Sequence, residues 1–340
     1  MEEGRYLYGL IKEKERKSFG LCGINDGEEV YTVAHQDIAC VISNSPVQDY
    51  SSMLKESLGR FLVKHQTIIE KIMKDHTIIP MKFGTFVFND DEVIEVLKRG
   101  YPQFKELLIN MDGKIELDVA ATYNDLNSII KEIGEEDSQI REFKAEIAKK
   151  PSSQTFQDRI KIGMMIKDAL DKRREKEQTS IIDFLKGITC DFQKHQLMDD
   201  KMILSCAFLL EKVKETDFDA ALKELDKEYK QKMNFRCVGP LPPYSFATCQ
   251  LKRIGFDQID EAKRLLDLQD KISLEEIKES YRNFAQRNHP DKHPENSQLK
   301  ERFEKVTCAY KLLTSCYQGE DISFEDNKQK NFIMVEIIRP

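Results

Sequence analysis

The sequence is poor in cysteine motifs. Of its 340 residues, eight are cysteine and none is tryptophan, and no two cysteines stand as Cys-x-x-Cys. A disulfide scaffold would carry about 8–10% cysteine, and zinc ribbons and thioredoxin-like sites need paired spacing. The cysteines are therefore expected to be reduced and to pack as small hydrophobic residues.

Long apolar runs are also missing. The longest, Met202 to Leu210, is far shorter than the ~20 residues that span a bilayer. The first five residues, Met1 to Arg5, lack the apolar stretch and small-residue cleavage site of a secretory signal. We therefore expect a cytoplasmic protein without a membrane partner.

Positive charge is in the minority. The chain has 53 lysines and arginines against 60 acidic residues, a net charge of −7. General binding to phosphate backbones needs clustered positive charge, so no nucleic-acid partner is expected. Hydrophobic residues make up 40% of the chain, which excludes a wholly disordered protein, and the length predicts two or three domains.

Residues 1–122 alternate strand and helix signals. Runs rich in β-branched and aromatic residues predict strands at 6–11, 29–33, 38–43, 78–87 and 115–119. Apolar residues at helical spacing predict one helix from Leu54 to Ile72, and Asp90 opens a second that ends at Gly113. This alternation predicts an α+β domain with the sheet on one side and the helices on the other.

A charged, helical connector is expected over residues 123–200, and a second α+β domain over 201–256. The second domain begins with the buried-type strand Met202–Leu210 and an amphipathic helix that contains Phe218 and Tyr229. Strands at 235–238 and 244–251 flank the turn-rich stretch Gly239–Pro243, which is predicted to be a rigid connection rather than a proline-rich ligand.

The C-terminal third changes character. Ser273 and Glu276 form a capping box that starts a helix, and Pro290 ends this helix near Asn288. Apolar residues at helical spacing between 303 and 313 predict a second, returning helix. Residues 257–320 are therefore predicted to be an all-α, antiparallel helical hairpin.

His289, Pro290 and Asp291 stand in the loop between these two helices. The stretches 281–294 and 303–313 resemble the J domain of the DnaJ/Hsp40 co-chaperones, and the resemblance covers about residues 258–320. It implies that a DnaK-type Hsp70 is the partner and that its ATP hydrolysis is stimulated. The second helix departs from the family's more basic pattern at Glu279, Asn283 and Gln286.

The loop chemistry is that of recognition rather than catalysis. Pro290 fixes φ and stiffens the loop, and the Asp291 carboxylate can accept two hydrogen bonds from a partner arginine. Lys278, Arg282 and Arg287 would steer the partner electrostatically. These three residues, with His289, Pro290 and Asp291, are the predicted Hsp70-binding residues.

Separate stretches in the other two-thirds resemble the gas vesicle protein GvpL/GvpF family, over about residues 4–252. The stretches are 6–10, 78–85, 113–117, 156–170 and 235–247, of which the last is the most specific. The resemblance implies a fold of two ferredoxin-like α+β units joined by helices. It also implies a cytoplasmic assembly factor that binds the small shell protein and other gas vesicle accessory proteins, and that in some members joins the vesicle.

Other functions find less support in the sequence. His289 and His293 have the spacing of a helical metal pair, but Pro290 and Pro294 disfavour a helix there, so no metal is expected. No local signature of a nucleophile or of a cofactor site is present, so we expect neither an enzyme nor a cofactor. The alternative to a vesicle assembly factor is a general Hsp70 co-chaperone whose N-terminal domains bind varied clients.

The C-terminus carries a last apolar segment. Phe332 to Ile338 has six apolar residues in seven and would be prone to aggregate if exposed. We therefore predict that the chain leaves the sheet of the second α+β domain after Leu251 and that this segment returns to add a strand to that sheet. That domain would comprise 201–256 plus 331–340, with the J region inserted in it and residues 321–330 as a linker.

Overall fold

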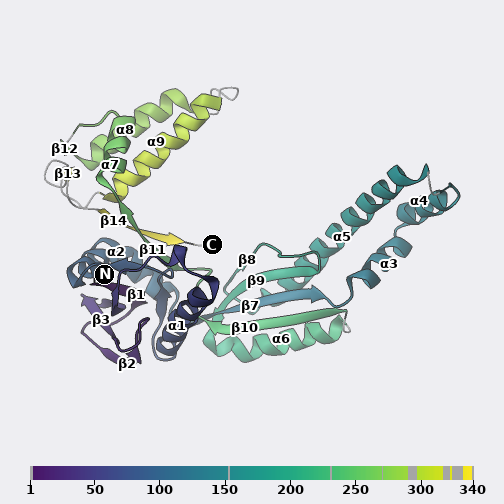
Figure 1. Ribbon diagram of the computed structural model, residues 1–340, viewed down its shortest axis with the longest axis horizontal. Helices are drawn as coiled ribbons and strands as arrows, with labels where there is room; N and C mark the ends of the chain where they lie inside the picture. The colour runs from purple at the N-terminus through teal and green to yellow at the C-terminus, as the bar shows by residue number, and fades with distance from the viewer. Residues whose placement is uncertain are drawn as a thin grey trace. The chain divides into compact units, whose positions relative to one another are not determined.

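The computed structural model describes residues 3–151, 154–229, 232–269, 271–289, 297–316, 322–323 and 332–338. The chain divides into two compact units (Figure 1). Unit one comprises Met1–Ile69, Met81–Leu107 and Cys249–Ile338, and unit two comprises Glu70–Pro80, Leu108–Thr248 and Arg339–Pro340. Each unit therefore contains segments that are far apart in the sequence.

Unit one contains an antiparallel sheet in the order β2-β3-β4-β1, and β6 also pairs with β1. The strands are β1 (Glu3–Ile11), β2 (Ser18–Cys22), β3 (Glu29–His35), β4 (Ile38–Pro46) and β6 (Phe86–Val87). The helices α1 (Lys55–Met73) and α2 (Asp90–Asn110) begin in this unit, and the short strand β5 (Ile78–Pro80) lies between them in sequence. The strands expected at 6–11, 29–33 and 38–43 and the two helices are confirmed in this order. β2 was missed, and the strand expected at 78–87 is divided into β5 and β6.

An aromatic cluster fills part of the core of unit one. Tyr6 and Tyr8 on β1 are fully buried, and the Tyr6 hydroxyl lies 2.9 Å from Nδ1 of His65 on α1. The Tyr6 ring also lies 4.9 Å from that of Phe86. Burial lowers the pKa of His65 to about 4, so the imidazole is neutral in the folded chain at neutral pH.

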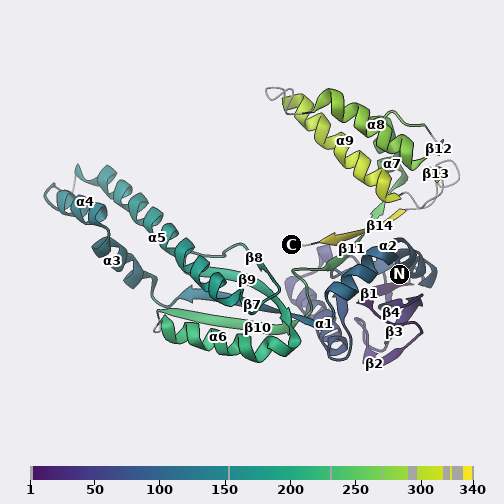
Figure 2. The ribbon, with the colours of Figure 1, turned by 180° about the vertical axis from the view of Figure 1, so that it is seen from behind.

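Unit two contains a second antiparallel sheet, in the order β10-β7-β9-β8. Its strands are β7 (Lys114–Tyr123), β8 (Asp191–Lys194), β9 (Met202–Glu211) and β10 (Met233–Leu241). The helix α6 (Glu215–Glu228) buries Phe218, Leu222 and Leu225 in the core of this unit. Three further helices, α3 (Leu126–Glu136), α4 (Ser138–Ala148) and α5 (Phe156–Leu185), form an arm that extends from one end of the sheet (Figures 1 and 2).

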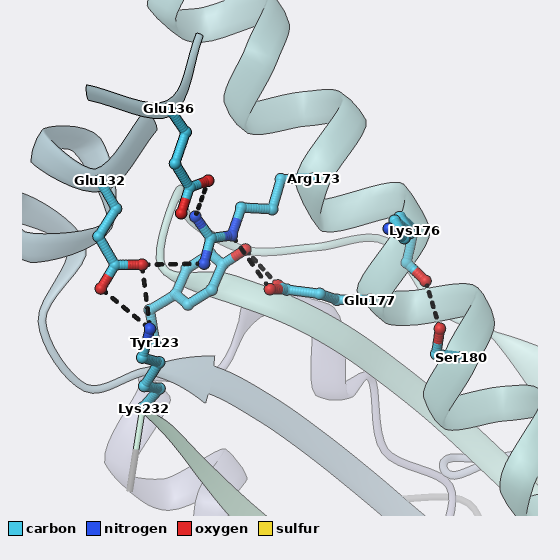
Figure 3. Close-up of polar contacts among 8 residues, drawn as sticks. All are labelled: Tyr123, Glu132, Glu136, Arg173, Lys176, Glu177, Ser180 and Lys232. Atoms are coloured by element: carbon cyan, nitrogen blue, oxygen red, sulfur yellow. Dashed lines mark hydrogen bonds and ion pairs between the residues drawn. The ribbon is translucent and has the colours of Figure 1, made fainter. Parts of the chain in front are cut away.

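An ion-pair network fastens this arm to the sheet (Figure 3). Arg173 on α5 pairs with Glu132 at 3.0 Å and Glu136 at 3.7 Å, both on α3, and with Glu177 at 3.2 Å. The hydroxyl of Tyr123, at the end of β7, donates to the Glu177 carboxylate. Arg173 therefore joins α5 to α3, and Glu177 joins α5 to the end of β7.

The strand at 115–119 was expected in the first α+β domain, and this placement was wrong. β7 lies in the centre of the second sheet, where Ile115, Leu117 and Val119 are directly opposite Leu210, Phe208 and Cys206 of β9. These six side chains form one continuous apolar face of the unit-two core. The short edge strand β8, in the expected helical connector, was also missed because its four residues are mostly exposed and polar.

The C-terminal segment does return to the strand that precedes the helices, but not to the sheet that we expected. β14 (Phe332–Ile338) pairs with β11 (Thr248–Ile254) in a separate two-stranded sheet. β11 belongs to unit one, where the Lys82 amide donates to the Cys249 carbonyl oxygen at 2.7 Å. Pro242 and Pro243 follow β10 and have no N–H to donate, so the chain leaves the second sheet before β11 begins.

In the sequence, the predicted helical hairpin lies between β11 and β14. It consists of α7 (Phe256–Leu265), α8 (Leu274–Asn288) and α9 (Ser297–Cys316). A two-residue pairing of β12 (Lys271–Ile272) with β13 (Ile322–Ser323) was not anticipated, and β13 falls in the stretch expected to be a linker.

Candidate functional site

The hairpin of α8 and α9 presents the loop that carries His289. Its core contains Ile277 on α8, Val306, Ala309 and Leu313 on α9, and Ile259 on α7, all buried. The rings of Tyr281 and Tyr310 stack with centroids 4.2 Å apart. These contacts hold α8 and α9 side by side and so fix the ends of the loop between them.

Both ends of α8 are defined by local contacts. Ser273 caps its N-terminus in a full capping box with Glu276, as the sequence predicts. At the other end, the Asn288 side chain donates to the Phe284 carbonyl oxygen at 3.0 Å. His289 follows with φ −63° and ψ 133°, an extended conformation typical of a residue before proline.

The structure places one residue of the His-Pro-Asp motif. His289 is half-buried, and its ring is steeply inclined to that of Phe303 on α9, with the ring centroids 5.4 Å apart. This contact orients the imidazole against the hairpin at the start of the loop. Pro290 and Asp291 lie outside the described residues, so their predicted roles stay predictions.

The three predicted steering cations do not form one patch. Lys278 and Arg282 are one turn apart on α8, whereas Arg287 is rotated by roughly 140° from Arg282 about the helix axis. Lys278 is also paired with Glu275 at 3.2 Å. Arg282 and Arg287 are exposed, on opposite flanks of the apolar face of α8.

A second candidate site surrounds the end of β10. The stretch Gly239–Pro243 was expected to be a connection outside the strands, but its first three residues belong to β10, where the pairing with β7 shifts register between Val238 and Leu241. Gly239 has φ +151°, and a Cβ there would lie 2.5 Å from Cδ2 of Leu117 and 2.9 Å from the Glu116 carbonyl oxygen. Only glycine fits this close approach to β7. The backbone of β10 therefore approaches β7 closely at this register shift.

A buried carboxylate binds Ser245, which follows the end of β10. Glu116 on β7 is 1% exposed and accepts hydrogen bonds from the amide and the hydroxyl of Ser245, both at 2.8 Å. His195, just after β8, places Nε2 3.4 Å from the same hydroxyl. Burial raises the pKa of Glu116 to about 7, and the like charge of Asp118 adds to the shift.

This cluster lacks the geometry of a catalytic triad. Ser245 bridges the carboxylate and the histidine, whereas a nucleophilic serine needs the histidine between itself and the acid. Among the described residues, no group of three histidine, cysteine or acidic side chains is arranged to hold a metal ion. The arrangement is suited to anchoring a loop.

Sequence reasoning did not single out Glu116 or Ser245. The alternation of Ile115, Glu116 and Leu117 marks Glu116 only as a residue of the polar face of a strand. One signal was available, because the stretch 235–247 is the most specific part of the family resemblance and contains Ser245. The partner of Ser245 is 129 residues away, and no local pattern links the two.

Two protein families match adjoining parts of the chain. The gas vesicle synthesis protein GvpL/GvpF family matches residues 4–248, and the DnaJ domain matches residues 256–318. The chain belongs to the GvpL/GvpF family. The boundary between the two matches falls at β11, the strand that precedes the helical hairpin.

Individual relatives agree with these matches. Gas vesicle protein F of Nostoc sp. is 24% identical over 73% of this chain and 99% of its own length. Gas vesicle protein F1 of Halobacterium salinarum is 22% identical over 72% of this chain and 93% of its own length. The chaperone protein DnaJ of Wolbachia pipientis is 42% identical over 50 residues, which are 15% of this chain and 13% of the relative.

Solved structures share the fold of the first two-thirds. The crystal structure of gas vesicle protein GvpF from Anabaena sp. has a TM-score of 0.63 at 22% identity, covering 72% of this chain and 98% of its own. GvpF from Microcystis aeruginosa has a TM-score of 0.59 at 21% identity over the same shares of the two chains. These structures confirm the α+β fold, and the DnaJ match over residues 256–318 confirms the helical C-terminal domain.

Proposed function

We propose that this chain is a gas vesicle assembly factor that binds the apolar shell protein and recruits a DnaK-type Hsp70 through its C-terminal hairpin. The observation that carries the proposal is the covalent union of the two families, with GvpL/GvpF features over residues 4–248 and DnaJ features over 256–318. A chain that joins these two regions brings whatever the first binds to the chaperone engaged by the second.

The union is physically reasonable for an apolar client. A shell subunit that must polymerise exposes apolar surface before it is incorporated, and such surface aggregates. A carrier that holds the subunit and delivers it to an ATP-driven chaperone would keep it competent for assembly. The chain would act by binding rather than by catalysis, in the cytoplasm and in contact with the growing vesicle.

The proposed Hsp70 contact uses the loop and one side of α8. His289, held against Phe303, would begin the contact, with Pro290 and Asp291 following in the loop. Lys278 and Arg282 share a helix flank and would face the partner together, whereas Arg287 would reach it only from the other flank. Asp291 would accept hydrogen bonds from an arginine of the Hsp70 ATPase domain.

The Hsp70 contact is tested by ATP hydrolysis. Purified full-length chain is added to a DnaK-type Hsp70, and the rate is compared for the parent and for Asp291→Asn, which removes the charge and keeps the shape. We expect the parent to stimulate hydrolysis and the variant to have lost the stimulation. Asp267→Asn is the matched control, because it removes one exposed carboxylate of the same domain, at φ 52°, a conformation that asparagine tolerates.

Equal stimulation by the parent and Asp291→Asn would refute the role of Asp291. Absence of stimulation by the parent would refute Hsp70 recruitment itself. Binding of the shell protein is measured separately, by capture of the chain on immobilised shell protein, and Asp291→Asn should bind as the parent does. Equal capture on unrelated apolar clients would instead favour a general co-chaperone.

A further inference from the structure

A groove lies on the side of the hairpin formed by α7 and α9, at the ends of β11 and β14. Its volume is about 690 Å³. Its apolar lining comes from all four elements, with Ile254, Ala262, Leu265, Ala309, Leu312 and Met334. The groove is therefore built partly by the two strands that enclose the hairpin, and not by the helices alone.

The rim of the groove has three cations and three carboxylates, and the ion-pair partners of its cations add two further carboxylates, Glu92 and Glu336. Its three cations are already paired, Lys252 with Glu336 at 2.5 Å, Arg253 with Glu92 at 2.8 Å and Lys305 with Glu301 at 2.8 Å. Two exposed carboxylates of the rim, Glu261 and Glu304, have no ion-pair partner within 4 Å among the described residues. An occupant of this groove should therefore bring apolar side chains flanked by positive charge.

The first half of α5 has this chemistry. Phe156, Ile160 and Met164 follow one another at every fourth residue and are 69%, 42% and 63% exposed. Arg159 and Lys167 flank this stripe, are exposed, and form no ion pair within the described part of the chain. This part of α5 lies in the arm beyond the sheet of unit two (Figure 1).

We propose that the apolar stripe of α5 in one copy of the chain docks into the α7–α9 groove of a second copy. Apolar anchors spaced by one helical turn are how an amphipathic helix binds a groove. Phe156, Ile160 and Met164 would be these anchors, and Arg159 and Lys167 would pair with Glu261 and Glu304. The contact joins different surfaces of the two copies, so a pair keeps one free helix on one copy and one free groove on the other, and chains can grow.

Charge reversal on each surface tests the contact in the full-length chain. One variant carries Glu261→Lys and Glu304→Lys in the groove, and the other carries Arg159→Glu and Lys167→Glu on α5. Sedimentation equilibrium over a range of protein concentrations should show association of the parent. Each variant alone should associate at least about tenfold more weakly, because two exposed ion pairs are replaced by two repulsions.

Mixing the two variants gives the sharper result. The native α5 of the groove variant meets the native groove of the other, and the two reversed surfaces also match in charge. The mixture should therefore recover association that neither variant shows alone. A matched control, Glu279→Lys with Lys172→Glu, reverses exposed charges on α8 and α5 away from both surfaces and should associate as the parent does.

Three outcomes would overturn the proposal. They are a parent that stays monomeric at all concentrations, variants that associate as strongly as the parent, and a mixture that stays dissociated. Circular dichroism of each variant establishes that it is folded, so that a loss of association is not read from an unfolded chain.

Discussion

Each unit of the molecule buries an ionisable side chain whose charged form burial disfavours, an imidazole in unit one and a carboxyl group in unit two. In unit one the neutral imidazole of His65 lies in an aromatic cluster, with its pKa lowered to about 4. In unit two the carboxyl group of Glu116 accepts a hydrogen bond from the Ser245 amide, with its pKa raised to about 7. Burial disfavours the charged form in both cases, so the same physical cause moves the two values in opposite directions.

The consequence is that acid should act differently on the two units. His65 takes up a proton in the unfolded chain near pH 6.5 but resists it in the folded chain, so stability is lost as the pH falls from 6.5 toward 4. Glu116 keeps its proton in the folded chain up to about pH 7, whereas the unfolded chain loses it near 4.5. The free-energy cost of burying Glu116 therefore grows as the pH rises from 4.5 to 7, and the stability of unit two falls over this range.

The largest effect is expected at Gly239, where β10 shifts register against β7. Gly239→Ala places a Cβ 2.5 Å from Leu117 at a positive φ, so we expect a loss of about 2–4 kcal/mol in the stability of unit two. Chemical denaturation followed by circular dichroism measures it. Gly163→Ala on α5 is the control, since nothing lies within 4 Å of its added Cβ, and it should be neutral or stabilise by up to about 1 kcal/mol. Equal denaturation midpoints for both variants would show that β10 does not approach β7 closely at Gly239.

The acid response of unit one should depend on His65. We expect the parent to lose up to about 3 kcal/mol between pH 7 and pH 4 from this residue, and His65→Phe to lose the corresponding pH dependence. Hydrogen exchange in peptides from β1 reports on this unit. If the protection factors of β1 amides, which are corrected for the intrinsic pH dependence of exchange, still fall with acid in the variant as they do in the parent, His65 is not the acid-sensitive group.

The response of unit two should have the opposite sign and depend on Glu116. Glu116→Gln imitates the protonated carboxyl group, so the decline in stability between pH 5 and pH 8 should shrink by about 1–3 kcal/mol. Hydrogen exchange in peptides from β7 measures it. Burial also raises the pKa of Asp118, which acts on Glu116, and a decline that persists in full in the variant would point to Asp118 instead.

The smallest effect is expected at Ser245. Ser245→Ala removes the hydroxyl hydrogen bond to Glu116 and leaves the amide bond, which should cost about 1 kcal/mol at pH 8. The pKa of Glu116 should rise further, because the lost bond favours the charged form. Ser180→Ala on α5 removes an exposed hydroxyl that bonds only to the Lys176 carbonyl oxygen, and it should change stability by less than about 0.5 kcal/mol. A Ser245 effect no larger than the Ser180 effect would contradict the anchoring role of Glu116.

Features with a local cause were predictable from the sequence. The capping box at Ser273, the end of α8 before Pro290 and the returning helix α9 each follow from residues within a few positions of one another. The sheet to which β7 belongs could not be predicted from local residues. Ile115 and Leu117 fit an apolar face in either sheet, and only their register with Leu210 and Phe208 decides between the two sheets.

The two candidate sites differ in the same way, since one has a local sequence signature and the other depends on residues that are far apart in the sequence. The motif at His289 is contiguous in the sequence, and its loop position follows from the helices on either side. The pairing of Glu116 with Ser245 spans 129 residues and depends on how β10 leaves its sheet, so no spacing rule could find it. The destination of β14 likewise depends on the prolines after β10, which detach β11 from the second sheet.

The central claim, that one chain joins the shell protein to an Hsp70, is tested most directly by a three-component capture. Tagged shell protein is immobilised and offered a DnaK-type Hsp70 with ATP, in the presence of the parent chain, of Asp291→Asn, or of no chain. The account predicts that the parent chain brings Hsp70 to the shell protein, and that Asp291→Asn is captured equally well but brings little Hsp70. Equal amounts of Hsp70 in all three samples would contradict it.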